Sequence, residues 1–390
     1  MFYLGIDIGK LNHAAGLIDH CGTTVAQLPT FSAHITGFRQ LASFIQRHLP
    51  PKATLLVGME ATGTYWTPLE HWLTAQGFAV VVLNPLKVSS LRNYGVRGSK
   101  TDRIDAVLIA QALRWQKSHP AVPLPARVVE LRWLTRLRVQ LVKERTRATL
   151  RIGSLLGCLF PEFDSLFPKL ASPSALAVLQ AAPTPADVIS MGEASLSEIL
   201  RSASRGKLGL KRARQLIVLA SASVGVASPT LAQALLLLLA EVKLFRDQIN
   251  TLEAQIAQIY DAANLPLHSL PGTGPILAAT YLSEIGSIAR FASAKQVVAF
   301  SGIDPKLRQS GKFNGQVRMS KRGSSYLRHA VYLACLSAVR TDDYFKAIYD
   351  RQLQRGKPKR RALGAVMNRF IHVLYAVWRD NRPYSPLTPA

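Results

Sequence analysis

The sequence is poor in cysteine and in acidic residues. Its 390 residues include three cysteines, Cys21, Cys158 and Cys335, which lie far apart in the chain. This spacing excludes a disulfide framework and a cysteine zinc site, and it favours a reducing compartment. Asp and Glu number 23 against 48 Lys and Arg, so the formal net charge is +25. A compact protein with this excess of positive charge needs a polyanionic partner, and we expect nucleic acid.

Signals for export or for a membrane span are also lacking. The chain opens on a strand-like apolar run rather than on a secretion signal, so we expect a cytoplasmic protein. Residues 216–240 contain no charged side chain and are long enough to cross a bilayer. Pro229 divides them into two runs, and each run suits a buried helix better than a membrane span. We therefore expect no membrane partner.

The first hundred residues alternate patterns typical of strands and helices. Three strand-like runs, FYLGIDI, HAAGLID and TTVAQL, precede a helix pattern near residues 34–48. A strand at 54–59, a helix at 65–76, a strand at 78–83 and a helix at 101–115 follow. This order predicts a ribonuclease H-like α/β domain over residues 1–120.

Long helices are expected in the middle of the chain, over residues 121–263. Residues 128–156 have helical periodicity, and eight Lys or Arg lie between Arg127 and Arg151. Such a helix can lie along a phosphate backbone, and the residues that we expect to bind nucleic acid are Arg136, Arg138, Lys143 and Arg145. A second helix has an apolar seam that predicts a coiled-coil region, formed with the helix near residue 140 or with a second subunit. An ordinary amphipathic helix in a core is the alternative. The seam consists of Val242, Phe245, Ile249, Leu252, Ile256 and Ile259.

The remaining residues, 264–390, predict a mainly α-helical carboxyl-terminal domain. The stretch LHSLPGTGPILAATYLSEIG resembles half of a helix-hairpin-helix. Gly272 and Gly274 allow a tight turn, and the amides of the following helix could bind a phosphate. The alternative is a simple turn between two helices.

Four acidic residues are candidates for a metal site. Asp7 lies in GIDIG at a strand, Glu60 ends the strand TLLVGME, and Asp102 and Asp105 in KTDRIDA share one helix face. Carboxylates in this arrangement can hold two Mg²⁺ ions, about 4 Å apart, at a phosphodiester. Taken singly, each acid is commonly a turn, cap or solvated residue, and their order on a ribonuclease H-like pattern favours catalysis. GIDIG also suits the actin and sugar-kinase fold, but no convincing second glycine-rich phosphate loop follows.

A basic stretch near the carboxyl terminus carries a candidate nucleophile. Between Lys306 and Arg328 there are seven cationic residues and no acid. We expect Ser310 to lie in an exposed, mobile loop, where its hydroxyl could attack a phosphodiester while cations stabilise the developing charge. Loop serines usually cap helices or turns, and four other serines compete for the role: Ser301, Ser320, Ser324 and Ser325. The cations expected to bind nucleic acid here are Lys306, Arg308, Lys312, Lys321 and Arg322.

Six ordered motifs together resemble one known family. GIDIGK, GMEATGTYW, KTDRIDA, SLPGTGPILAA, FSGIDPKLRQSGK and MSKRGSSYLRHA are similar to motifs of the insertion-sequence transposases of the "one-ten" family, also called DEDD transposases. The resemblance implies that Asp7, Glu60, Asp102 and Asp105 hold Mg²⁺ in a RuvC-like domain. It implies that Ser310 is the nucleophile of the carboxyl-terminal domain. It also implies donor and target DNA as partners, a structured noncoding bridge RNA as guide, and a homo-oligomer, a dimer or tetramer.

We therefore expect a transposase that cuts and rejoins DNA through a covalent phosphoserine intermediate. Two alternatives stay open. One is a RuvC-like endonuclease that hydrolyses DNA junctions with a metal-activated water and forms no covalent intermediate. The other is a nucleic-acid-binding protein without catalysis, in which the acids only shape the fold.

Overall fold

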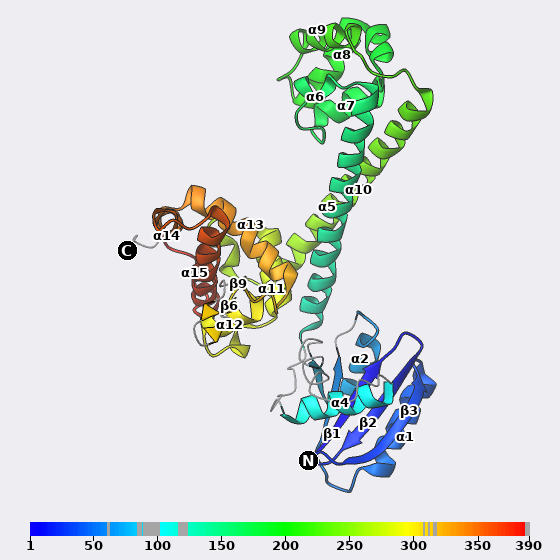
Figure 1. The fold of residues 1–390 in the computed structure, drawn as a ribbon, viewed down its shortest axis with the longest axis vertical. Coiled ribbons are helices and arrows are strands. Elements are labelled where there is room, and N and C mark those ends of the chain that lie inside the picture. The colour runs from blue at the N-terminus through cyan, green and yellow to red at the C-terminus, as the bar shows by residue number, and fades with distance from the viewer. Residues whose placement is uncertain are drawn as a thin grey trace. The chain divides into compact units, whose positions relative to one another are not determined.

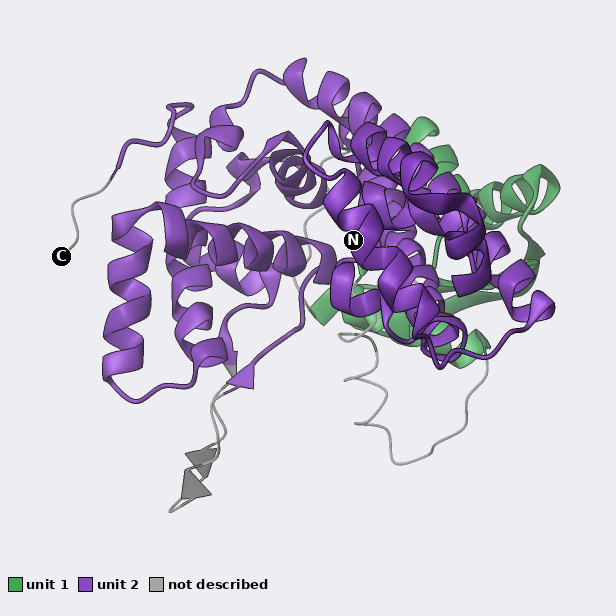
Figure 2. Ribbon diagram, turned by 90° about the horizontal axis from the view of Figure 1, so that it is seen from above, with its two compact units in different colours: residues 1–123 green, residues 124–390 purple. Residues whose placement is uncertain are grey.

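The computed structural model describes residues 1–60, 63–83, 88, 102–115, 124–306, 309–310, 313–314 and 318–386. Contacts divide the chain into two compact units, residues 1–123 and residues 124–390, which Figure 2 colours separately. Across the described ranges, no helix has the length and apolar character needed to cross a membrane.

Unit 1 is a mixed five-stranded sheet with helices on both faces (Figure 1). The strand order is β3-β2-β1-β4-β5. β1 is antiparallel to β2 and parallel to β4, and β4 is parallel to β5. This architecture is consistent with the predicted ribonuclease H-like domain. Its elements are β1 (Phe2–Ile8), β2 (Asn12–Ile18), β3 (Thr24–Ser32), α1 (Ile35–His48), β4 (Leu55–Glu60), α2 (Thr67–Ala75), β5 (Ala79–Leu83) and α4 (Asp102–Trp115).

The alternation of side chains along β1 assigns residues to the two faces of the sheet. Leu4, Ile6 and Ile8 are buried in the core that α1 and α2 cover. The residues between them point to the opposite face, because successive side chains of a strand alternate. There Tyr3 packs against a core that includes Leu113 of α4. The odd-numbered positions of β1 therefore face α4.

A row of three glycines lies under α4. Gly5 of β1 pairs with Gly16 of β2 and with Gly58 of β4. A Cβ atom on Gly5 would lie 2.1 Å from the carbonyl oxygen of Ala106, so the backbones of β1 and α4 touch. The absence of side chains lets the helix lie directly on the sheet, as close approach of two backbones requires.

Unit 2 is helical and contains two hydrophobic cores joined by two long helices, α5 and α10. The amino-terminal end of α5 and the carboxyl-terminal end of α10 share one core with α11–α15, and their other ends share the second core with α7–α9. The two helices are therefore antiparallel, and they lie side by side in Figure 1. The helices are α5 (Ala126–Leu159), α6 (Phe163–Leu166), α7 (Pro173–Ala181), α8 (Pro185–Ser204), α9 (Leu210–Ser221), α10 (Pro229–Asp261), η1 (Pro266–Ser269), α11 (Pro275–Ile285), η2 (Ile288–Arg290), α12 (Ala294–Ser301), α13 (Ser325–Thr341), α14 (Asp343–Gln354) and α15 (Lys359–Arg379).

The apolar seam of α10 packs against α5, which was one of the two partners predicted. Val242, Ile249 and Ile256 of the seam are buried. Arg138 of α5 donates to Glu253 of α10 over 2.7 Å, which adds a polar link beside the seam. Pro229 is the first residue of α10, as expected of a proline at a helix start, and α9 ends before it at Ser221.

Four short strands interrupt the carboxyl-terminal helices, in the basic stretch where we predicted a loop. β6 (Pro305–Lys306) pairs with β9 (Arg318–Met319), and β7 (Gln309–Ser310) pairs with β8 (Phe313–Asn314), both antiparallel. These strands are defined by cross-strand pairing, which a composition rich in Lys, Gly and Ser does not predict.

Candidate active site

Asp7 and Glu60 extend from neighbouring strands onto the face of the sheet that α4 covers. Ile6 of β1 pairs with Met59 of β4, so the next residues along these parallel strands are Asp7 and Glu60. Asp7 lies two residues after Gly5, and Glu60 lies two residues after Gly58 and ends its strand. Two steps along a strand return to the same face. Both side chains are half-buried.

The helix α4 carries the other two acids in its first turn. Asp105 is buried, with 4% of its surface exposed, and Asp102 is exposed. Asp105 precedes Ala106, whose carbonyl oxygen lies against Gly5. Asp105 is therefore in the turn of α4 that rests on β1, near the glycine row that leads to Asp7. Asp102 lies one turn earlier.

The donor set fits hard divalent ions, but the four carboxylates do not form one tight group. In the described part of the chain, one group of three possible metal ligands has its ligand atoms within 4.8 Å of one another, namely Asp19, His20 and Cys21 in the turn after β2. Two ions about 4 Å apart need their ligands spread over both ions, so a two-metal site does not require four oxygens within such a sphere. Carboxylate oxygens are the ligands that Mg²⁺ prefers.

Ser310 lies in strand β7 and not in an irregular loop, which corrects the prediction. Its backbone pairs with Phe313. Between β6 and β9, Pro305 pairs with Met319. Antiparallel pairing of short strands at both places gives the serine segment a defined backbone.

We call the paired strands β6–β9 the Ser310 hairpin. Hydrogen bonds join the residues before β6 to those after β9, at the base of this hairpin. The Lys321 amide donates to the Gly302 carbonyl over 2.9 Å, and the Ser320 amide donates to the Asp304 carbonyl over 2.8 Å. Arg328 donates from one nitrogen, Nη1, to the Ser301 carbonyl at 2.9 Å. A Cβ atom on Gly302, which has φ +69°, would lie 2.6 Å from the Gly323 amide. Only glycine suits this backbone angle and this approach.

Three of the four competing serines have hydroxyl partners that explain them structurally. Ser301 is fully buried and donates to the Val298 carbonyl. Ser320 donates to the Asp304 carboxylate. Ser324 caps α13. Ser325 is the first residue of that helix and is exposed.

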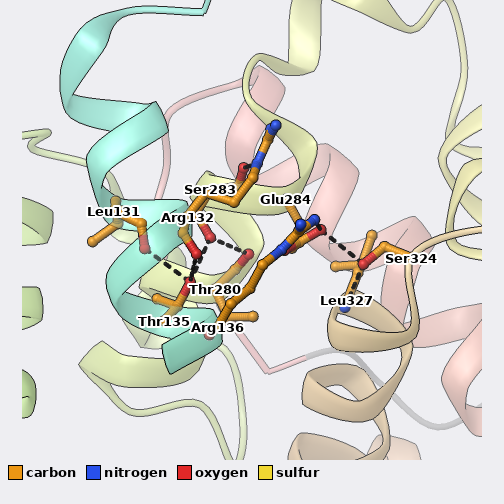
Figure 3. Close-up of polar contacts among 9 residues, drawn as sticks. All are labelled: Leu131, Arg132, Thr135, Arg136, Thr280, Ser283, Glu284, Ser324 and Leu327. Carbon is orange, nitrogen blue, oxygen red and sulfur yellow. Dashed lines mark hydrogen bonds and ion pairs between the residues drawn. The ribbon is translucent and has the colours of Figure 1, made fainter. Parts of the chain in front are cut away.

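Sequence reasoning missed Glu284, a buried acid at the junction of three helices (Figure 3). Both of its carboxylate oxygens accept from Arg136 of α5, at 2.7 and 2.9 Å. Ser324 donates to Glu284 at 2.7 Å and accepts from the Leu327 amide, so it links the acid to the start of α13. Donation to the Glu284 carboxylate raises the pKa of the Arg136 guanidinium above its usual value. The available signal was a single acid within an apolar helix.

The structure gives several of the predicted nucleic-acid contacts an internal role. The guanidinium groups of Arg136 and Arg138 bind Glu284 and Glu253, respectively. Gly272 faces α13, because a Cβ atom on it would lie 2.4 Å from the Ala334 carbonyl oxygen. A 3-10 helix, η1, precedes this turn, in place of a full first helix of a helix-hairpin-helix.

The other predicted contacts lie on α5, before α11 and in or next to the hairpin strands. Lys143 is exposed and Arg145 is half-buried on α5. Gly274 precedes α11 with extended backbone, and a Cβ atom there would meet no atom within 4 Å. Lys321 and Arg322 are exposed at the base of the hairpin. Lys306 is described by its backbone, in β6, and two predicted contacts lie outside the described residues: Arg308 and Lys312.

Comparison with known proteins identifies the family. A family model described as "Transposase" matches residues 4–161, and one described as "Transposase IS116/IS110/IS902 family" matches residues 265–350. The insertion element IS900 uncharacterized 42 kDa protein of Mycobacterium paratuberculosis is 32% identical over 297 residues, covering 74% of each chain. The chain belongs to the IS110 family of transposases.

Two further relatives align over nearly the whole chain. The pilin gene-inverting protein of Moraxella bovis is 26% identical over 398 residues, covering 98% of this chain and 97% of the relative. The insertion element IS110 uncharacterized 43.6 kDa protein of Streptomyces coelicolor is 27% identical over 406 residues, covering 100% and 96%. Membership makes this chain a DNA transposase or recombinase, and the matched DEDD-type domain indicates that it depends on a divalent metal.

Proposed function

We propose that this IS110-family transposase cuts and rejoins DNA with Ser310 as the nucleophile. Asp7, Glu60, Asp102 and Asp105 hold divalent metal, which we propose to be two Mg²⁺ ions. The observation that carries the metal site is the placement of Asp7 and Glu60 at neighbouring positions of two parallel strands, on the face where α4 brings Asp105.

The bound ions would stabilise charge on the phosphate and on the leaving oxygen. The Ser310 oxygen attacks phosphorus and loses its proton, and the bond from phosphorus to one sugar oxygen breaks. That oxygen takes up a proton, and the number of phosphoester bonds is unchanged. A hydroxyl of a second strand then attacks the phosphoserine, which rejoins DNA and restores the serine. The reaction therefore needs no external energy source.

The basic sequence around Ser310 supports this role. Lys321 and Arg322 at the base of the hairpin are exposed. Exposed cations can stabilise the charge that develops on a phosphate during its transfer. Three competing serines already have partners within the fold.

We further propose DNA donor and target sites, a structured noncoding guide RNA and a homo-oligomer as partners. The net charge of +25 supports a polyanionic partner, and family resemblance suggests the guide. Sequencing of nucleic acid that copurifies with the full chain tests the guide. One discrete structured RNA is expected, and random fragments would contradict it.

Trapping of covalent complexes tests the nucleophile. Labelled donor DNA is incubated with full-length protein and Mg²⁺, and the denatured mixture is run on a gel. The native protein should leave DNA attached to protein, Ser310→Ala should leave none, and the control Ser325→Ala should behave as the native protein. Full recombination by Ser310→Ala without an adduct would refute the serine role. Junction cleavage by the native protein with no adduct would favour the hydrolytic nuclease.

A further inference from the structure

A cavity of about 910 Å³ lies beside α15 in unit 2. Residues of α15 between Arg369 and Arg379, residues 292–295 at the start of α12, Asp380 and residues 382–385 line it. Its volume is within the range of about 300–1,000 Å³ that is usual for ligand pockets. Neither the metal site nor Ser310 uses it.

The lining of this cavity is strongly basic. Among the described lining residues the one acid is Asp380, which binds Arg379 with a distance of 2.7 Å between nitrogen and oxygen. The surplus positive charge favours an anionic ligand. The basic lining residues are Lys295, Arg369, His372, Arg379 and Arg382.

Three basic residues of α15 form one stripe beside the cavity. Arg369 and His372 are three residues apart, and Arg379 follows seven residues later with Ala376 between them, so these positions share a helix face. The stripe covers about 15 Å of helix at 1.5 Å per residue. Burial lowers the pKa of His372, and the nearby Arg369 and Lys295 lower it further. Arg369 and Lys295 thus lie near His372 and carry the positive charge at this place, while the lowered pKa favours neutral His372.

Internal contacts fix the aromatic part of the lining. The Tyr375 hydroxyl donates to the Phe291 carbonyl at 3.1 Å, and the Tyr384 hydroxyl donates to Asp342 at 2.9 Å. Arg369 donates from Nε to the Tyr344 hydroxyl, which leaves its two Nη groups for a ligand. The tyrosine rings and the guanidinium are therefore positioned before a ligand arrives.

We propose that this cavity binds the phosphodiester backbone of a single-stranded nucleic acid. Lys295 and Arg369 contact phosphates, and Tyr375 and Tyr384 present ring surfaces to the bases. Cations that follow a backbone, combined with fixed aromatic rings, are typical of single-strand binding. The inference requires no serine chemistry, so it can hold or fail independently of the proposed recombination mechanism.

Equilibrium binding to labelled oligonucleotides tests the proposal. Full-length protein is titrated into oligothymidylate, oligouridylate and a DNA duplex, with binding followed by fluorescence anisotropy at several salt concentrations. Lys295→Gln should weaken single-strand binding roughly tenfold at low salt, the loss of one charge-assisted contact. It should also reduce the slope of log Kobs against log salt by about 0.7.

Two further variants separate the cavity from general charge. Ala376→Gln adds volume to the basic stripe without changing charge, and it should weaken single-strand binding while duplex binding stays unchanged. Lys357→Gln is the matched control, because Lys357 is an exposed cation of the same unit outside the cavity lining. It should bind as the native protein does, and thermal melts should show that all variants fold.

Each outcome decides the proposal. A loss confined to oligothymidylate assigns the cavity to a DNA strand, and a loss confined to oligouridylate assigns it to an RNA strand. Both results support single-strand binding. Native affinity in Lys295→Gln and Ala376→Gln would overturn it, as would an equal loss for single strands and duplex.

Discussion

Arg136 of α5 binds both carboxylate oxygens of Glu284 in α11, and Glu284 also accepts from the Ser324 hydroxyl that caps α13. One buried acid thus connects the long helix α5 to the helix that follows the Ser310 hairpin. The side chain of Glu284 is 2% exposed and that of Arg136 is 40% exposed, so the burden of desolvation falls mainly on the carboxylate.

Loss of the Arg136 charge should destabilise unit 2. Arg136→Met leaves Glu284 buried with Ser324 as its remaining side-chain donor, and we expect a loss of about 2–3 kcal/mol in the free energy of unfolding. Urea denaturation measures it. The control on the same helix is Arg147→Met, which breaks an exposed pair with Glu144 and should cost under about 0.5 kcal/mol. Adding Glu284→Gln to Arg136→Met should restore part of the stability, and no recovery would argue against an uncompensated charge.

The glycine row predicts different effects from one added methyl group. In Gly5→Ala the new Cβ meets backbone atoms of Ala106 and Ala110 at 2.1 and 2.4 Å, so α4 must move away from the sheet. We expect a loss of about 2 kcal/mol and of most metal-dependent DNA cleavage. In Gly58→Ala the new atom meets the flexible side chain of Leu113 at 3.0 Å, and the effect should be near neutral. Comparable urea midpoints for the two variants would contradict this account.

Metal binding should stabilise unit 1 through the four acids. At a Mg²⁺ concentration about a hundred times Kd, binding to the folded state adds about 2.7 kcal/mol, and EDTA should remove it. Calorimetry with and without Mg²⁺ should show that Mg²⁺ raises the stability of the native protein. Asp105→Asn should show no such rise. Cys21→Ser, in the Asp19–His20–Cys21 group, should keep the rise. The opposite pattern would move the metal site to that turn.

Buried His13 predicts a loss of stability at acidic pH. Burial lowers its pKa below the ordinary 6.5, so between the two values the unfolded chain binds a proton that the folded chain does not. Stability from neutral His13 is complete above pH 6.5 and is lost as pH falls through the folded pKa. We expect the Tm of unit 1 to drop between pH 7.5 and pH 5.5. His13→Gln should show a smaller drop, and an unchanged drop would assign the effect to other groups.

Much of the fold follows from the sequence because local pattern and tertiary packing agree. The seam of Val242, Ile249 and Ile256 predicted a helix pair, and these side chains are buried where α10 meets α5. Pro229 divided two apolar runs in the sequence, and it is the first residue of α10, where its ring suits the first turn. The hairpin strands were missed because their order comes from cross-strand bonds between residues with weak strand propensity.

The candidate site was predictable only in its parts. The sequence placed Asp7 and Glu60 at the ends of strands. It did not give the parallel register that makes them neighbours, because register depends on tertiary packing. Arg136 was expected to bind a phosphate, but it binds Glu284. Charge counts do not reveal which cation pairs with a buried acid. Sequence periodicity predicts which residues share a helix face. It does not predict that Arg136 binds Glu284, 148 residues away, because that contact depends on how the helices pack.

Because α5 leaves the carboxyl-terminal core and α10 returns to it in the opposite direction, the chain departs and re-enters at nearly one point. Removing about seven residues, close to two turns at 3.6 residues per turn, from each helix would keep the remaining inward side chains nearly in phase. The distance to the distal helices can thus be lengthened or shortened by paired insertions and deletions without altering the core that carries Glu284. The helix pair α5 and α10 therefore sets this distance in steps of helical turns.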